Sequence, residues 1–141
     1  MPIGVRKDPY SGYNFIVEIE GVITAGFTDV SGLSMETVFD TVKEGGVNDY
    51  EHKLPRGTKY SDITLKRGLV GWELWLWYRM TVQGLIKKKS GTICLLDHSG
   101  SPVFMWFFFD AFPIKWEGPT LNAATNTIAT ETLVLTHQGL Y

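Results

Sequence analysis

The stretch "TICLLDHSGSPVFMWFFF", residues 92–109, carries two apolar runs on either side of a short polar segment. In both runs, 92–96 and 103–109, apolar residues fill alternate and intervening positions, which is the pattern of strands buried on two sides. The segment "DHSGSP" between them has the residue types of a turn. We therefore predict a β-hairpin whose strands are covered on both faces.

Two other segments, 13–19 and 62–66, alternate apolar and polar residues, which is the period of a half-buried strand. Further strands are predicted at 22–27, 34–42 and 128–136. By contrast, "FPIKWEGPTLNAATN", residues 112–126, is punctuated by Pro and Gly and is predicted to be irregular. The sequence thus predicts a mainly β domain.

Residues 71–89 follow a helical period of about 100° per residue. The broad apolar face expected to pack on the core comprises Trp72, Trp75, Tyr78, Val82, Leu85 and Ile86. Trp77 and Met80 fall on the opposite side, where we expect contact with another chain or with a covering loop. The lysines at 87–89, followed by Ser90 and Gly91, are typical of a helix C-terminus.

Length and composition indicate one domain, residues 1–141, with a net charge of −2 that gives no overall attraction to nucleic acid. Five Trp, six Tyr and eight Phe favour surface that is buried in an interface. A lone cysteine and the absence of an apolar leader in the first residues predict synthesis in a reducing cytoplasm. The most apolar run, 103–109, is far shorter than the about 20 residues of a membrane-spanning helix, so no such segment is predicted.

Asp97, His98 and Ser99 are the residue types of a hydrolase triad, but neighbours on one turn point their side chains apart. We interpret them as a plain turn. Cys94 lies in an apolar strand, where cysteine usually acts as a small inert hydrophobic residue. The sequence therefore predicts no catalytic residues.

No arrangement of metal-binding or phosphate-binding residues stands out either. His52, His98 and His137 are far apart in sequence, and Gly21, Gly26 and Gly32 do not match a phosphate-binding loop. Glu18 and Glu20 share one face of a predicted strand, and a solvated face explains them better than a pair of catalytic acids. We predict no cofactor and no metal.

The segment "KEGGVNDYEHKLPRGTKY", residues 43–60, is too long for an ordinary connection, since most connections have about 4–6 residues. Strands are predicted on both sides of it, so it is interpreted as an extended hairpin arm. Its mixed charges suit a protein interface better than a polyanion, and such an arm gains enough surface to become ordered by contacting neighbouring subunits. The candidate inter-subunit residues, taken with the helix, are Glu44, Gly45, Gly46, Asn48, Tyr50, Lys53, Leu54, Pro55, Arg56, Gly57, Tyr60, Trp77 and Met80.

The arm, quoted further as "EGGVNDYEHKLPRGTKYSDITLKRG", resembles the segment that marks inner-tube proteins of contractile phage tails and bacterial contractile injection systems. The resemblance covers nearly the whole chain in the same order. It is carried by "DPYSGYNFIVEIEG", "AGFTDVSGL", "LWLWYR", "LLDHSGSPV" and "AFPIKWEGPTLNAATNTIATETLVLTHQGL".

This resemblance implies two packed antiparallel sheets that form a barrel-like body with one flanking helix. It also implies hexameric rings that stack into a hollow inner tube, with no enzymatic activity. The implied partners are a surrounding sheath protein, baseplate and terminator or cap proteins, and a cargo of protein or DNA in the lumen. The chain would be made in the bacterial cytoplasm and would belong to a phage tail or to an extracellular or membrane-anchored injection particle.

Two other kinds of function stay open on the residues alone. One is a β-barrel carrier of a small apolar ligand, which requires a sizeable internal pocket. The other is a single-stranded nucleic-acid module, in which aromatic side chains stack on bases beside a basic groove. Neither predicts rings or tubes in electron microscopy.

Overall fold

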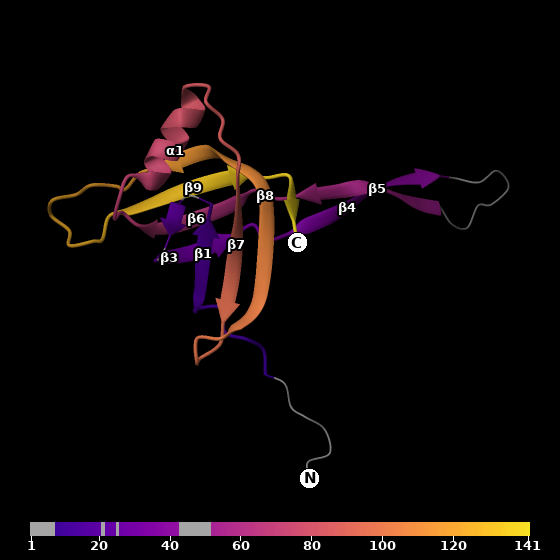
Figure 1. Cartoon of the computed structure of the whole chain (residues 1–141), viewed down its shortest axis with the longest axis horizontal. Helices are drawn as coiled ribbons and strands as arrows, with labels where there is room; N and C mark the ends of the chain where they lie inside the picture. The colour runs from indigo at the N-terminus through magenta and orange to yellow at the C-terminus, as the bar shows by residue number, and fades with distance from the viewer. Residues whose placement is uncertain (1–7, 21, 25, 43–51) are drawn as a thin grey trace, which may run out of the picture.

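The computed structural model describes residues 8–20, 22–24, 26–42 and 52–141. Within these residues the fold is mainly β with one helix, as predicted (Figure 1). The helix is α1 (Glu73–Val82), and the strands are β1 (Phe15–Ile19), β2 (Val22–Thr24), β3 (Phe27–Ser31), β4 (Met35–Val42), β5 (His52–Tyr60), β6 (Ile63–Gly68), β7 (Lys89–Leu96), β8 (Pro102–Glu117), β9 (Thr130–Thr136) and β10 (Gly139–Leu140).

The main sheet has the strand order β2-β1-β7-β8-β9-β6-β3, and β10 pairs with β8. The hairpin predicted at 92–109 is confirmed, because β7 and β8 pair antiparallel with Cys94 opposite Met105 and Thr92 opposite Phe107. One face of this sheet encloses the core. The largest fully buried side chains include Val17, Ile63, Leu65, Leu74, Ile93, Phe108, Leu133 and Leu135.

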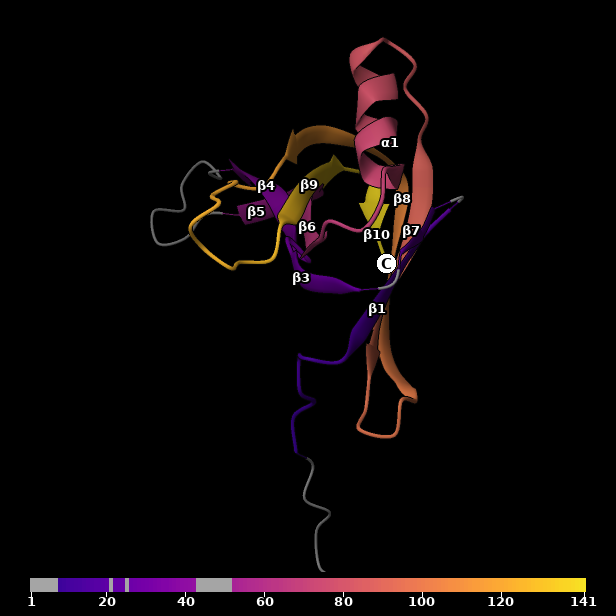
Figure 2. The ribbon, with the colours of Figure 1, turned by 90° about the vertical axis from the view of Figure 1, so that its left-hand side faces the viewer.

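Strand β8 continues to Glu117, so the prediction of an irregular segment from residue 112 is wrong for 112–117. The first part of β8 pairs with β7 and the last part with β9, and Asp110 between them has a positive φ of 49°. Pro113 sits beside a register shift, where its missing N–H group is tolerated. This bend at the middle of β8 places the two halves of the sheet on opposite sides of the core (Figure 2).

The sheet does not close into a barrel, which corrects the barrel-like body that the resemblance implied. Its terminal strands β2 and β3 each have one partner within the described chain, and closure would require them to pair with each other. A second, two-stranded sheet of β4 and β5 stands apart from the first.

The helix is shorter than predicted, because it ends at Val82 and not at Lys89. Gly84 has a φ of 88°, its N–H donates to Thr81 O at 3.0 Å, and the N–H of Leu85 donates to Met80 O at 2.9 Å. This is a Schellman termination, which glycine allows at little steric cost. The lysines at 87–89 are therefore not at the helix terminus, and Lys89 is the first residue of β7.

The buried face of the helix also differs in part from the predicted one, although Tyr78 packs against the core as expected. Trp77 is buried with 3% of its surface exposed, whereas Trp72, expected in the core, is 72% exposed. Leu85 and Ile86 contributed to the predicted apolar face although they lie outside the helix. Of the two expected partners of Trp77, the structure shows the covering loop, since its Nε1 donates to Lys87 O at 2.9 Å. Trp77 is therefore a core residue and is removed from the inter-subunit candidates.

We expect Trp77→Phe to lower the free energy of unfolding by about 1–2 kcal/mol, because it removes this hydrogen bond and part of a buried ring. Urea denaturation measures the change. Trp72→Phe is the matched control at an exposed position, with an expected change within about 0.5 kcal/mol. Equal losses in the two variants would contradict the packing described here.

Candidate assembly interface

The strands β4 and β5 form an antiparallel ribbon, named here the β4–β5 ribbon, that extends away from the main sheet (Figure 1). Its register runs from Met35 opposite Tyr60 to Val42 opposite His52, with one shift after Val38. Residues 52–60 of the predicted arm form strand β5. The candidates at 44–50, namely Glu44, Gly45, Gly46, Asn48 and Tyr50, lie outside the described residues.

Almost all side chains of the ribbon are exposed, including Phe39 and Leu54 at about half of their surface. The candidates Lys53, Leu54, Pro55, Arg56 and Gly57 are all among these exposed residues. Within the ribbon, Arg56 forms an ion pair with Asp40 at 3.2 Å and Lys53 Nζ lies 5.3 Å from the centroid of the Phe39 ring. These contacts brace the ribbon internally and leave its apolar side chains uncovered.

Two further candidates lie closer to the body of the protein. Tyr60, at the base of the ribbon, is partly buried, and its ring centroid lies 5.6 Å from that of His137. Met80 is partly buried on the helix. Their contact with another subunit stays a prediction.

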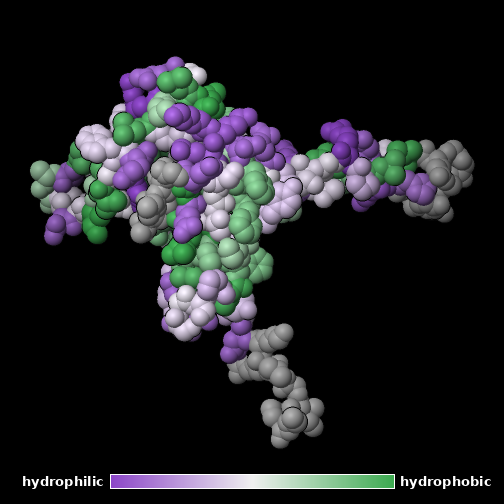
Figure 3. All heavy atoms as spheres, viewed as in Figure 1, coloured by the Kyte–Doolittle hydropathy of each residue, from purple (hydrophilic) through white to green (hydrophobic). Residues whose placement is uncertain are grey.

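The outer face of the β1–β7–β8–β10 half of the sheet is apolar, although it faces away from the core. Neighbouring strands align Ile16 with Cys94 and Met105, and Glu18 with Thr92 and Phe107. The exposed apolar side chains on this surface, named here the apolar face, are Ile16, Met105, Phe107, Phe109 and Tyr141. Figure 3 shows hydrophobic residues gathered over β7 and β8 on the side toward the viewer.

The other half of the sheet differs in this respect. The outward positions of β6, β9 and the last part of β8 alternate with the core residues Leu65, Leu133 and Leu135. Apart from Phe112, Ile114 and Val134, they are polar: Thr64, Lys66, Lys115, Glu117, Thr132 and Thr136. Polar-out alternation is what a sheet with one wet face requires. The apolar face therefore marks the half of the sheet that needs a partner.

The Asp97-His98-Ser99 segment is a turn, as interpreted from the sequence. Asp97 Oδ1 accepts hydrogen bonds from the Ser99 hydroxyl at 2.7 Å and from the N–H groups of Ser99 and Ser101, each at 2.9 Å. The imidazole of His98 contacts another residue, since its Nδ1 lies 2.6 Å from the hydroxyl of Tyr13. The Ser99 hydroxyl and the backbone N–H groups lower the pKa of Asp97.

This depressed pKa predicts a pH-dependent turn. The hydrogen bonds to the ionised carboxylate stabilise the turn at neutral pH, and this contribution is lost as the pH falls below the ordinary value of about 3.9 through the lower pKa of the folded state. NMR titration of the Ser99 and Ser101 amide resonances should give a midpoint below about 3.9. The same resonances should show no such transition in Asp97→Ala, and a midpoint above the ordinary value would contradict the prediction.

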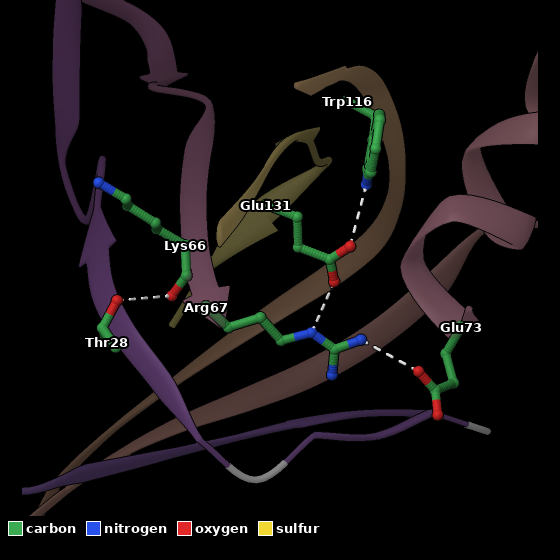
Figure 4. Close-up of polar contacts among 6 residues, drawn as sticks. All are labelled: Thr28, Lys66, Arg67, Glu73, Trp116 and Glu131. Atoms are coloured by element: carbon green, nitrogen blue, oxygen red, sulfur yellow. Dashed lines mark hydrogen bonds and ion pairs between the residues drawn. The ribbon is translucent and has the colours of Figure 1, made fainter. Parts of the chain in front are cut away.

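A buried ionic network, missed by the sequence analysis, joins the helix to the sheet (Figure 4). Arg67 Nε donates to Glu131 Oε1 at 2.7 Å, and another nitrogen of Arg67 donates to Glu73 Oε2 at 3.0 Å. Trp116 Nε1 donates to the second oxygen of Glu131 at 3.3 Å. The pKa of Glu73 is lowered by a backbone hydrogen bond and by Arg67.

Strand alternation contained a signal for this network. Arg67 continues the inward series Ile63 and Leu65, and Glu131 begins the inward series Leu133 and Leu135. The partnership itself depends on the pairing of β6 with β9, which places Arg67 directly opposite Glu131. Among the described residues, every buried side-chain nitrogen and oxygen has a hydrogen-bond partner, including those of this network. The network therefore has a structural role.

Among the described residues, no group of three or more His, Cys, Asp or Glu side chains is arranged to hold a metal ion. Cys94 is a buried residue of β7, as interpreted from the sequence. His137 has its two ring nitrogens 2.9 Å from Ser61 O and 3.1 Å from Gly139 O, and so connects β9 and β10 to the start of β6.

The family model of the T4-like virus tail tube protein gp19 matches residues 11–141. The chain belongs to this tail tube protein family. A comparison with curated protein sequences finds no match. Membership confirms the resemblance drawn from the sequence and gives the chain the function of a structural tail tube protein.

Three solved structures show how far the tail tube likeness extends. A chain of the anti-feeding prophage cap, a tube terminating cap, is 26% identical with a TM-score of 0.86 over 100% of this chain and 94% of that one. A chain of the PVC sheath/tube terminator, from an extracellular contractile injection system, is 27% identical with a TM-score of 0.86 over 97% and 98%. A chain of the PVC sheath-tube complex is 28% identical with a TM-score of 0.82 over 94% and 90%.

The part of the chain that the structure describes contains no helix long and apolar enough to span a membrane.

Proposed function

We propose that this tail tube protein forms hexameric rings that stack into the rigid inner tube of a contractile particle. The observation that carries the proposal is the apolar face, which stays exposed in the single chain: Phe107 and Phe109, on the central strand β8 of the main sheet, are 43% and 40% exposed. Large uncovered apolar patches on soluble proteins usually mark interaction surfaces. A ring of copies supplies the missing cover.

The open edges of the main sheet support the same arrangement. Within the described chain, strands β2 and β3 end the strand order and each has a partner on one side only, and such edges invite uncontrolled aggregation unless another chain covers or pairs with them. Contact between copies around a ring removes such edges, as closure does in barrels. The mostly polar outer half of the sheet is free to stay in contact with water in this assembly.

The structural comparisons support the wider set of partners. The similar chains come from a sheath-tube complex, a sheath/tube terminator, a tube terminating cap and a baseplate. By analogy, we infer that a sheath surrounds the tube of this chain, that baseplate and cap proteins end it, and that the lumen carries a cargo of protein or DNA. The chain acts as a structural protein without catalysis, is made in the bacterial cytoplasm, and works in a phage tail or an injection particle.

Electron microscopy and light scattering of the purified protein test the proposal. We expect six-fold rings or stacked tubes, and rings alone count as support because they already cover the apolar face. A strictly monomeric mass across a wide concentration range, without rings or tubes, would overturn it. The carrier and nucleic-acid alternatives predict that monomeric result.

A further inference from the structure

We propose that His137 is a pH-sensitive clamp, which as a doubly protonated imidazolium fixes the base of the β4–β5 ribbon to the C-terminal strand β10. This inference goes beyond the proposed function and does not depend on it, because the clamp lies within a single chain. Three observations carry it: the two partners of the imidazole, the contacts at the base of the ribbon, and the position of His137 between the ribbon and β10.

The imidazole of His137 faces two oxygens that can only accept hydrogen bonds. Its Nε2 lies 2.9 Å from Ser61 O and its Nδ1 lies 3.1 Å from Gly139 O, and both distances are typical of N–H···O hydrogen bonds. A neutral imidazole has one N–H group and one lone pair, so it donates to only one of these carbonyl groups. The imidazolium has two N–H groups and donates to both.

The surroundings of His137 make this difference matter. The side chain is only 9% exposed, so water does little to screen a ring lone pair that points at a carbonyl oxygen. Burial disfavours the charged ring, whereas hydrogen bonds from both N–H groups to carbonyl oxygens favour it. The charged form therefore satisfies the observed arrangement completely, and the neutral form leaves one of the two contacts repulsive.

Ser61 joins the two ends of the ribbon at its base. It directly follows the last residue of β5, and Ser34 directly precedes the first residue of β4. The Ser61 N–H donates to Ser34 O at 3.3 Å, and the hydroxyl of Ser34 donates to that of Ser61 at 2.6 Å. Because the carbonyl oxygen of Ser61 is the partner of His137, the imidazole acts on both ends of the ribbon.

The chain is closely packed at this base. Gly32 has a φ of 89°, and a Cβ atom there would overlap with Asp62 O, so the position requires glycine. The ring of Tyr60 packs on the imidazole with 5.6 Å between the ring centroids. On the opposite side of His137, Gly139 pairs with β8 of the main sheet. The clamp therefore fixes the ribbon to the main sheet, and a ribbon with a fixed base loses less conformational freedom when it binds a partner.

The neighbouring titratable groups leave the imidazole to its two carbonyl partners. Those nearest to it along the elements that it connects are Tyr60 at the end of β5, Asp62 before β6, Asp110 of β8 and Tyr141 after β10. Among the described residues, only the ring of Tyr60 contacts the imidazole, and neither carboxylate pairs with it. Histidine changes its charge between about pH 5 and 8. The charged form makes both bonds, so the clamp is complete at the acidic end of this range and is lost as the pH rises.

Nitrogen-15 NMR of the full chain tests the protonation state directly. We expect both ring nitrogens of His137 to carry a proton at about pH 5, and one of them to have lost it at about pH 8. Hydrogen exchange of the Ser61 and Gln138 amides, which donate to Ser34 O and Phe109 O, reports the two attachments of the clamp. Their protection, corrected for the intrinsic effect of pH on exchange, should fall at least about tenfold over this range, because a hydrogen bond from a charged donor is lost.

Two histidine variants separate the clamp from a general effect of pH. His137→Gln has no group that titrates in this range, so the protection of both amides should be below that of the wild type at about pH 5 and should stay constant up to about pH 8. His98→Gln removes an exposed histidine that contacts Tyr13 and should retain the pH dependence of the wild type.

Measurements on the wild type decide the inference even if His137→Gln does not fold. A single proton on the His137 ring at about pH 5, or equal protection of the two amides at both ends of the range, overturns it. A wild-type chain that never assembles overturns the proposed function and leaves the clamp standing, since NMR and hydrogen exchange report on the single chain.

Discussion

Removing the outer part of the β4–β5 ribbon should abolish rings and tubes while leaving a folded domain. Val38 and Gly57 are register partners, so an Asn-Gly turn replacing residues 39–56 retains the inner ladder of the ribbon. Among the described residues of the deleted segment, 39–42 and 52–56, none belongs to the main sheet or to the hydrophobic core, because β4 and β5 form a separate sheet. We expect the free energy of unfolding of the main domain to change by no more than about 1 kcal/mol.

The physical reason for lost assembly is that the ribbon carries exposed apolar side chains, Phe39 and Leu54 among them, that a second copy would cover. Light scattering should report a monomer at concentrations where the wild type forms rings. Tubes of normal dimensions from the shortened chain would contradict the role of the ribbon in assembly.

Hydrogen exchange gives an independent measurement. Described ribbon amides should exchange fast in the free wild-type chain and slowly in tubes, while the β1 amides, paired on both sides, should be protected in both.

The strands were the most predictable part of the fold, because alternation is a local property of the sequence. The hairpin at 92–109 and the strand at 62–66 follow from it directly, and the structure confirms both. The end of the helix could not be placed by periodicity, because Leu85 and Ile86 continue the apolar pattern after Gly84 has turned the backbone. The continuation of β8 through Pro113 depends on pairing with β9, which is a tertiary contact.

Of the two parts of the candidate interface, the arm could be predicted from the sequence and the apolar face of the sheet could not. The length and mixed charge of residues 43–60 pointed to an arm that needs a partner, and 52–60 form the exposed strand β5. The two-sided apolar pattern of β7 and β8 pointed to double coverage, yet it could not show which side faces the core. Only the structure places Phe108 inward and Phe107 and Phe109 outward. The apolar face could therefore be identified only from the structure.

Replacing Glu131 with alanine should cost about 3–5 kcal/mol of stability, since it leaves the guanidinium of Arg67 buried without its closest partner. The side chains of Arg67 and Glu131 are 3% and 0% exposed, so water cannot replace the lost carboxylate. The indole of Trp116 loses its acceptor at the same time. Glu73 remains in contact with Arg67, but its own side chain is half exposed and compensates weakly.

The exposed ion pair of the ribbon provides the matched comparison. Arg56 and Asp40 are joined at 3.2 Å with side chains 66% and 54% exposed, and Asp40→Ala should change stability by no more than about 1 kcal/mol. Thermal or urea unfolding measures both changes, and each variant is compared with its own unsubstituted chain. Glu131→Ala is measured in the chain with the shortened ribbon. Asp40→Ala is measured in the full chain at a concentration too low for assembly, because assembly would add to the apparent stability. Glu131→Gln keeps an acceptor for Arg67 and should fall between the wild type and Glu131→Ala. If Glu131→Ala costs no more than Asp40→Ala, the buried network does not hold the helix to the sheet, and the packing of Trp77 and Leu74 alone must do so.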